Sequence, residues 1–164
     1  MIITLKNKHT LHVDNFIFKC CIGKKGLTRS KKEGDKKTPK GKYRLGNLYY
    51  RGDRLTLPNT KLKCVEIKKH MGWCDDINYP KKYNKPIISN KQIKHEKLKR
   101  TDHKYDLLIP IKYNFEKTIP GLGSCIFIHL TRDYKPTEGC IALSQKDFLI
   151  MLKIIKKNSI IKIL

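Results

Sequence analysis

Short apolar runs broken by turn residues constrain the fold of this chain more than any other feature. Residues 2–5, 10–13 and 16–22 are rich in β-branched and aromatic side chains, and Lys-Asn and Asp-Asn turn signals separate them. Runs this short and this closely bounded favour strands over helices. We therefore expect the chain to begin as a β-meander.

The rest of the chain continues this pattern and adds one helix near its end. Strand-like runs cover residues 42–50, 62–68, 105–113, 124–130 and 160–164, a glycine-punctuated loop covers 23–41, an irregular stretch covers 70–93, and a short helical turn is expected within 95–103. Ser144 followed by Asp147 is a typical helix start, and apolar residues recur at helical spacing from Phe148 to Ile155. The sequence therefore predicts a mostly β fold with one helix near the C-terminus.

Length and apolar patterning indicate one soluble domain. The chain has 164 residues, enough for a single domain over residues 1–164 with a core of its own. Its first residues show no apolar signal core and no small-residue cleavage site. The longest apolar region, residues 148–155, is interrupted by Lys153 and is too short to span a bilayer. We expect no transmembrane segment, and the oligomeric state stays open.

The charge is strongly positive, with 37 Lys and Arg against 14 Asp and Glu, a formal net charge of +23. Such a surface attracts nucleic acid, an anionic membrane or another polyanion. Lysines are spread along most of the chain, as a biased base composition would also produce, and no nucleic-acid-binding signature accompanies them. A basic polyanion-binding module is therefore one alternative, and no specific nucleic-acid partner is predicted.

Cysteine and histidine spacing argues against a metal or a disulfide framework. The six cysteines include the vicinal pair Cys20-Cys21 but no C-x-x-C pair, and the six histidines do not cluster at ligand spacing. We predict free thiols, no metal and no cofactor.

One histidine and one cysteine stand out as candidates for chemistry. His129 ends an apolar strand, and Cys140 follows Gly139 eleven residues after that histidine. A thiolate is a strong nucleophile, and a nearby imidazole is the usual means of forming one. A glycine before the nucleophile permits a tight turn, whose N–H groups at Gly139 and Cys140 are candidates to stabilise an oxyanion. Taken alone, the pair is also compatible with ordinary buried packing.

Five motifs in order give this pair a context. Residues 137–143 read Thr-Glu-Gly-Cys-Ile-Ala-Leu, and upstream stand Gly-Asp-Lys-Lys-Thr-Pro-Lys-Gly (34–41), Gly-Trp-Cys-Asp-Asp (72–76) with Tyr-Asn (83–84), Tyr-Asp-Leu-Leu-Ile (105–109) and Gly-Ser-Cys-Ile-Phe-Ile-His (123–129). Together they resemble the L,D-transpeptidases, the YkuD-type domain of bacterial cell-wall enzymes. Glu138, Ala142 and the short interval from His129 to Cys140 depart from the commoner family pattern but are similar to a subgroup with the Gly-Trp-Cys-Asp-Asp segment.

The resemblance implies a fold and a reaction. The fold would be a YkuD-like β-sandwich or barrel. Cys140 would be the nucleophile and His129 its base, and the thiolate would form a thioester with a peptidoglycan stem peptide that an amine then resolves. Water in place of the amine would make the site a carboxypeptidase. The resemblance places the protein in the periplasm or cell envelope, whereas the absence of a visible signal peptide suits a cytoplasmic Cys-His peptidase or amidase.

Further residues are weaker candidates for the site. Thr137 and Ser124 are expected to position it through their hydroxyls, or to serve only a turn and a strand. Trp73 is a candidate either for a wall of the cleft, where it would contact substrate, or for a position in the core. Asp75 and Asp76, close to it in sequence, are also candidates to contact substrate. Arg54 and His103 are the remaining candidate substrate contacts, and Cys125, four residues before His129, is expected on the same strand face.

Overall fold

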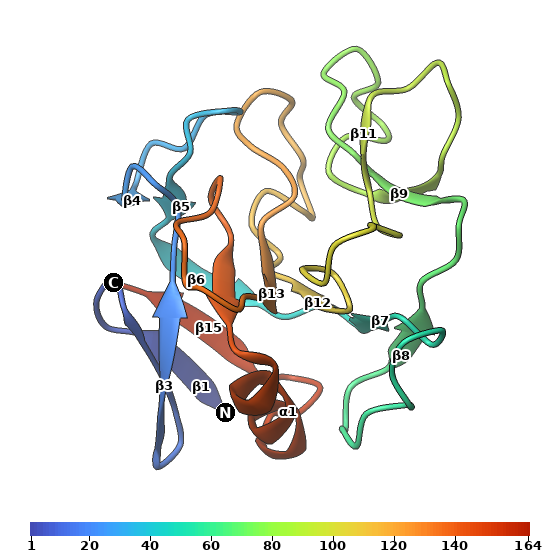
Figure 1. Ribbon diagram of the computed structural model, residues 1–164. Helices are drawn as coiled ribbons and strands as arrows, with labels where there is room; N and C mark the ends of the chain where they lie inside the picture. The colour runs from blue at the N-terminus through green and yellow to red at the C-terminus, as the bar shows by residue number, and fades with distance from the viewer.

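Ten strands form one curled sheet in the computed structural model, which describes residues 1–164. They are β1 (Ile2–Leu5), β2 (Thr10–Val13), β3 (Phe16–Cys21), β6 (Gly41–Arg44), β7 (Leu48–Tyr50), β8 (Cys64–Glu66), β12 (Leu107–Pro110), β13 (Phe127–Leu130), β14 (Ile141–Leu143) and β15 (Ile160–Ile163). Their order in space is β6-β15-β1-β2-β3-β14-β13-β12-β7-β8 (Figure 1). The expected meander is therefore present as β1, β2 and β3.

The sheet curls until its end strand β6 approaches β12. Leu45, just after β6, forms an isolated antiparallel bridge with Ile111, just after β12. Next to this bridge the Lys112 N–H donates to the Arg44 carbonyl at 2.9 Å. Because β6 and β12 are far apart in the strand order, these contacts draw the sheet round a common interior.

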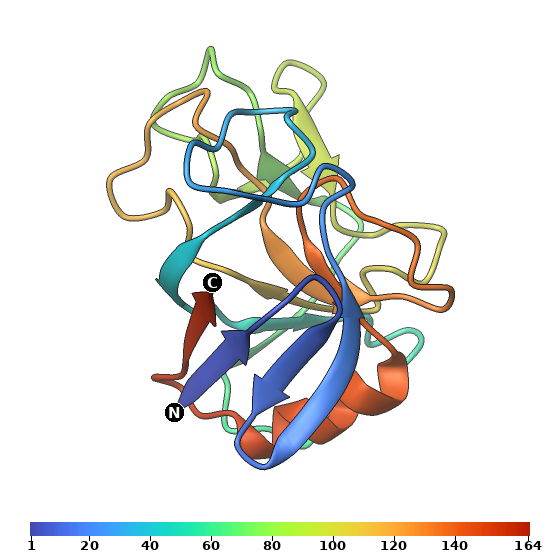
Figure 2. The ribbon, with the colours of Figure 1, turned by 90° about the vertical axis from the view of Figure 1, so that its left-hand side faces the viewer.

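The two ends of the chain pair with each other inside this sheet. Strand β1 runs parallel to β15, with Ile3 opposite Ile161 and Leu5 opposite Ile163 (Figure 2). These four side chains are almost completely buried. Since alternate residues of a strand share one face, both strands contribute to the same core.

The single helix, α1 (Gln145–Ile154), completes the larger of two hydrophobic clusters. Ser144 caps it, accepting the Asp147 N–H at 3.1 Å, and Phe148, Met151 and Leu152 are fully buried. They join a cluster of 24 buried residues that are mainly Ile and Leu. The prediction of a mostly β fold with one helix near the C-terminus is confirmed. No helix is long and apolar enough to cross a bilayer.

A small three-stranded sheet forms where the sequence predicted an irregular stretch (70–93) and a helical turn (within 95–103). β9 (Met71–Cys74) pairs on one side with β10 (Pro86–Ile88) and on the other with β11 (His95–Lys97). The helical turn expected within 95–103 was wrong, because Glu96 lies opposite Trp73 in a β-ladder that no local pattern reveals. The loop 23–41 likewise contains two-residue strands, β4 (Leu27–Thr28) and β5 (Thr38–Pro39), paired in parallel.

Candidate active site

A cavity of about 930 Å³ opens between the strand ends and the loops above them. Its walls come from residues 24–34, from the chain around β9 and β11, from residues 100–105 and from residues 124–142. Six basic and five acidic side chains line it, so most of the net charge of +23 lies outside the cavity.

Strand register puts Cys140 and His129 on one face of the sheet. β13 runs parallel to β14 with His129 opposite Ala142, and two residues earlier the Phe127 N–H donates to the Cys140 sulfur at 3.4 Å. Residues two apart on a strand point to the same side. Cys140, Ala142, Phe127 and His129 therefore share a face, and the small methyl group of Ala142 leaves space beside the imidazole. Both His129 and Cys140 line the cavity.

The His129 imidazole is held in a defined tautomer. Its Nδ1 lies 2.9 Å from the Leu130 carbonyl oxygen, which can only accept, so Nδ1 carries the proton and Nε2 keeps its lone pair. The Tyr105 ring packs against the imidazole edge-on at 5.5 Å between centroids. Burial lowers the pKa of His129 to about 4, so the ring is neutral at pH 7. Nε2 is therefore available as a base.

The Cys140 thiol is buried and protonated in the free protein. Burial raises its pKa to about 12, and the hydrogen bond from the Phe127 N–H opposes that rise. The thiol donates to the Cys125 carbonyl at 3.2 Å. All six cysteines are free thiols. The free site is thus a neutral thiol and a neutral imidazole rather than a preformed ion pair.

A tight turn over residues 137–140 carries the cysteine. The Thr137 hydroxyl donates to the Cys140 carbonyl at 2.6 Å and accepts the Gly139 N–H at 3.1 Å. Gly139 has φ 142°, a left-handed conformation that favours glycine, and a Cβ there would lie 3.0 Å from the Lys37 carbonyl oxygen. The Gly139 N–H is bonded to Thr137, whereas the Glu138 and Cys140 N–H groups of this turn have no protein acceptor.

Three more predicted residues line the cavity alongside these. The Ser124 hydroxyl donates to Glu33 Oε2 at 2.7 Å, and the Tyr83 hydroxyl donates to the same oxygen. Asp75 places one carboxylate oxygen 3.2 Å from Lys94 Nζ, while its Oδ1 is buried without a hydrogen-bond partner. Nε2 of His103 is likewise buried and unpartnered.

Trp73, Asp76 and Arg54 are not brought to the cavity. Trp73 is buried beneath it, and its indole N–H donates to Asn84 Oδ1 at 2.9 Å. Asp76 accepts the Asn78 and Lys94 N–H groups, each at 3.0 Å. Arg54 pairs with Asp106 at 2.8 Å. Each of these side chains has a local structural contact that accounts for its place.

Sequence reasoning did not single out several residues that surround the cavity. The buried Lys31 lines it and pairs with Asp35 at 2.5 Å. Arg100 lines it too, lying over the Tyr105 ring with its guanidinium carbon 5.0 Å from the ring centroid. Tyr105 stood in a quoted motif, but that motif gave no sign that the ring contacts His129. The Lys31–Asp35 and Arg100–Tyr105 contacts are local in sequence, but the contact of Tyr105 with His129 and the gathering of these residues at one cavity depend on the folded chain.

The fold and this cavity define a class. A buried thiol beside a neutral imidazole, on one face of a curled sheet, is an arrangement suited to nucleophilic acyl transfer. The sequence model of the YkuD family, described as the L,D-transpeptidase catalytic domain, matches residues 2–163. The chain belongs to this family and is an L,D-transpeptidase-type enzyme. No curated protein and no solved structure gives a significant match.

Proposed function

We propose that the protein is a cysteine-dependent L,D-transpeptidase that acts on peptidoglycan stem peptides through a thioester on Cys140. The observation that carries this proposal is the shared strand face of Cys140 and His129 inside one cavity. Family membership adds the reaction class. By the same resemblance we propose the periplasm or cell envelope as the place of action.

The first half-reaction begins from the neutral pair. The thiol turns from the Cys125 carbonyl, and its sulfur attacks the substrate amide carbon as its proton passes to His129 Nε2. The imidazolium then returns that proton to the leaving amine as the carbon–nitrogen bond breaks. This step leaves a thioester on Cys140 and a neutral His129.

The second half-reaction reverses these roles. The acceptor amine of a neighbouring stem gives a proton to His129 Nε2 as its nitrogen attacks the thioester carbon. Collapse of the intermediate breaks the carbon–sulfur bond, and the sulfur recovers its proton. Water in place of the amine would release a trimmed peptide instead, so acceptor choice separates transpeptidase from carboxypeptidase.

Stabilisation of the oxyanion falls mainly to one backbone group. Gly139 and Cys140 were both candidates, but the Gly139 N–H is already bonded to the Thr137 hydroxyl. The Cys140 N–H has no protein acceptor and is the group we assign to the oxyanion. Thr137 acts by stabilising the turn, since its hydroxyl bonds both the Gly139 N–H and the Cys140 carbonyl.

Muropeptide analysis tests this function. Purified tetrapeptide stems are incubated with the protein, and the products are separated and weighed. The proposal predicts cross-linked dimers, with loss of the terminal D-residue from the donor. Tripeptides without dimers would identify a carboxypeptidase. Unchanged stems, with a folded protein, would contradict both activities, and a salt-sensitive mobility shift of DNA or RNA would then favour the polyanion-binding alternative.

A further inference from the structure

Thr38, in β5, is a fully buried polar residue outside the cavity lining. Its hydroxyl accepts the Gly23 N–H at 3.0 Å and donates to the Gly139 carbonyl at 2.8 Å. Thr38 and Gly139 are 101 residues apart in sequence. A single hydroxyl therefore joins the loop 23–41 to the turn that carries the nucleophile.

This bond fixes the orientation of the peptide unit between Gly139 and Cys140. A trans peptide is planar, and its C=O and N–H point in opposite directions. Because Thr38 holds the Gly139 oxygen on its own side, the Cys140 N–H faces the other way. That N–H has no protein acceptor. The hydroxyl thus sets the direction of the group that we assign to the oxyanion.

The Gly139 carbonyl accepts no hydrogen bond other than the one from the Thr38 hydroxyl. A Cβ on Gly23 would lie 2.5 Å from the Lys36 carbonyl oxygen and 3.1 Å from the Gly139 Cα, so the two backbones touch here. The left-handed φ of Gly139 is open to several ψ values, because glycine has no side chain to restrict it. A glycine peptide can rotate where other residues cannot. The Thr38 hydroxyl is the side chain that holds its carbonyl in place.

We propose that Thr38 is a positioning residue that aims the Cys140 N–H at the oxyanion of the acyl-transfer reaction. This inference rests on the proposed function of Cys140. Thr38 does not touch substrate, and it acts only through the Gly139–Cys140 peptide unit. Loss of its hydroxyl should therefore slow reactions that form a tetrahedral oxyanion more than reactions that only need the sulfur.

Two reactions at the same thiol separate these effects. A carbapenem acylates the sulfur through a tetrahedral oxyanion, whereas iodoacetamide alkylates it by displacement of iodide without one. Both rates are read at Cys140 by peptide mass spectrometry on folded protein. Thr38→Val keeps the volume and removes the hydroxyl. We expect its acylation rate to fall about 100-fold, as for loss of an oxyanion donor, while alkylation stays within about twofold.

Matched variants complete the test. Thr38→Ser keeps the hydroxyl and should restore most of the acylation rate. Ser159→Ala removes another fully buried hydroxyl, which accepts the Lys156 N–H at 2.8 Å at a position outside the cavity lining, and should change neither rate. Thr38→Ala serves as a second variant without the hydroxyl in case Thr38→Val does not fold.

The outcomes are distinct. Equal falls in both rates, or no fall in acylation, would overturn the positioning role. Failure of both the Val and Ala variants to fold, with a folded Ser variant, would identify the hydroxyl as structural and overturn it too. A wild-type protein that is alkylated at Cys140 but never acylated would instead contradict the proposed function itself.

Discussion

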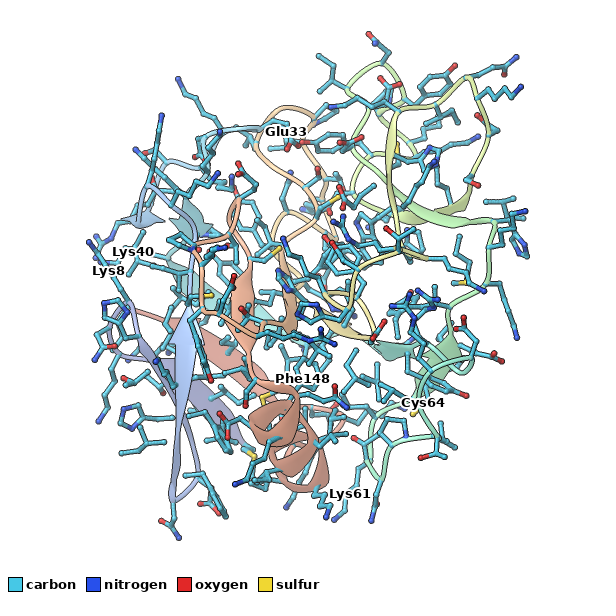
Figure 3. All side chains as sticks on the ribbon, in the orientation of Figure 1. Lys8, Glu33, Lys40, Lys61, Cys64 and Phe148 are labelled. Carbon is cyan, nitrogen blue, oxygen red and sulfur yellow. The ribbon has the colours of Figure 1, made fainter.

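The two hydrophobic clusters of the molecule differ in composition and in what they support. The larger contains 24 buried residues, mainly aliphatic, from the sheet and α1. The smaller contains eight, among them Trp73, Tyr105, Phe127 and Cys140. Its aromatic rings pack edge-on, and the centroid of the Phe127 ring lies 5.2 Å from that of Trp73 and 5.8 Å from that of Tyr105. In Figure 3 Phe148 of the larger cluster lies by the helix, and Glu33 of the cavity lies at the opposite end.

From this difference we expect the larger cluster to contribute mainly to stability and the smaller one to orient the residues of the site. Aliphatic burial in the larger cluster is non-directional and scales with the area removed from water. The aromatic cluster adds fixed orientations, because the Tyr105 ring contacts both Phe127 and the His129 imidazole. Changes in the larger cluster should therefore lower the free energy of unfolding, and changes at the edge of the smaller one should lower reaction rates.

The largest effect is expected at His129. His129→Gln keeps a neutral polar side chain but removes the base, so acylation by a carbapenem should slow by about 10²- to 10⁴-fold. Stopped-flow or timed mass spectrometry measures the rate, and the midpoint of thermal unfolding serves as the control. A variant that reacts at the wild-type rate would remove His129 from the mechanism.

Phe148 should show the opposite behaviour. It is fully buried in α1 within the larger cluster, and truncation leaves a cavity. Phe148→Ala should lower the free energy of unfolding by about 3–5 kcal/mol, measured by urea denaturation. The acylation rate of the folded fraction at low temperature should be unchanged. A large loss of rate without loss of stability would show that the two clusters are not separable.

Acid should destabilise the protein through His129. Its folded pKa of about 4 lies below the unfolded value of about 6.5. Between these pH values the unfolded chain binds a proton that the folded protein does not, so stability falls as pH falls. The fall attributable to this residue is about 3 kcal/mol. Urea titrations at several pH values measure it, and His129→Gln should flatten the curve in this window.

The smallest effect is expected at Glu138, next to the nucleophile turn. Its exposed carboxylate pairs with Lys24 at 2.6 Å and Lys36 at 3.5 Å. Exposed ion pairs contribute little, so Glu138→Gln should change the free energy of unfolding by less than about 1 kcal/mol. A loss of several kcal/mol in denaturant unfolding would mean that this pair anchors the loop 23–41 to the turn.

Local signals in the sequence predicted much of the fold. Ser144 and the spacing of Phe148, Met151 and Leu152 sufficed for α1, because capping and helical periodicity are local. Strand β11 was missed, since its state depends on pairing with β9 across twenty residues of chain. Closure of the sheet near Leu45 and Ile111 was also not predicted, because it too depends on pairing between distant segments of the chain.

The site was predicted less completely, for the same physical reason. Motif order pointed to His129 and Cys140, and the structure places both in one cavity. Trp73 and Asp75, two positions apart, share a motif but not a location, because Trp73 is buried outside the cavity lining and Asp75 lines it. Thr38 stood in a quoted motif, yet its bond to Gly139 exists only in the folded chain.

The proposed reaction depends on a thioester-type acyl-enzyme at Cys140. Intact-mass spectrometry after incubation with a carbapenem tests it most directly, with Cys140→Ala as the matched variant. We expect one covalent adduct on the wild-type protein, mapped to Cys140, and none on Cys140→Ala. An adduct that persists in Cys140→Ala, or no adduct on folded wild-type protein, would contradict it.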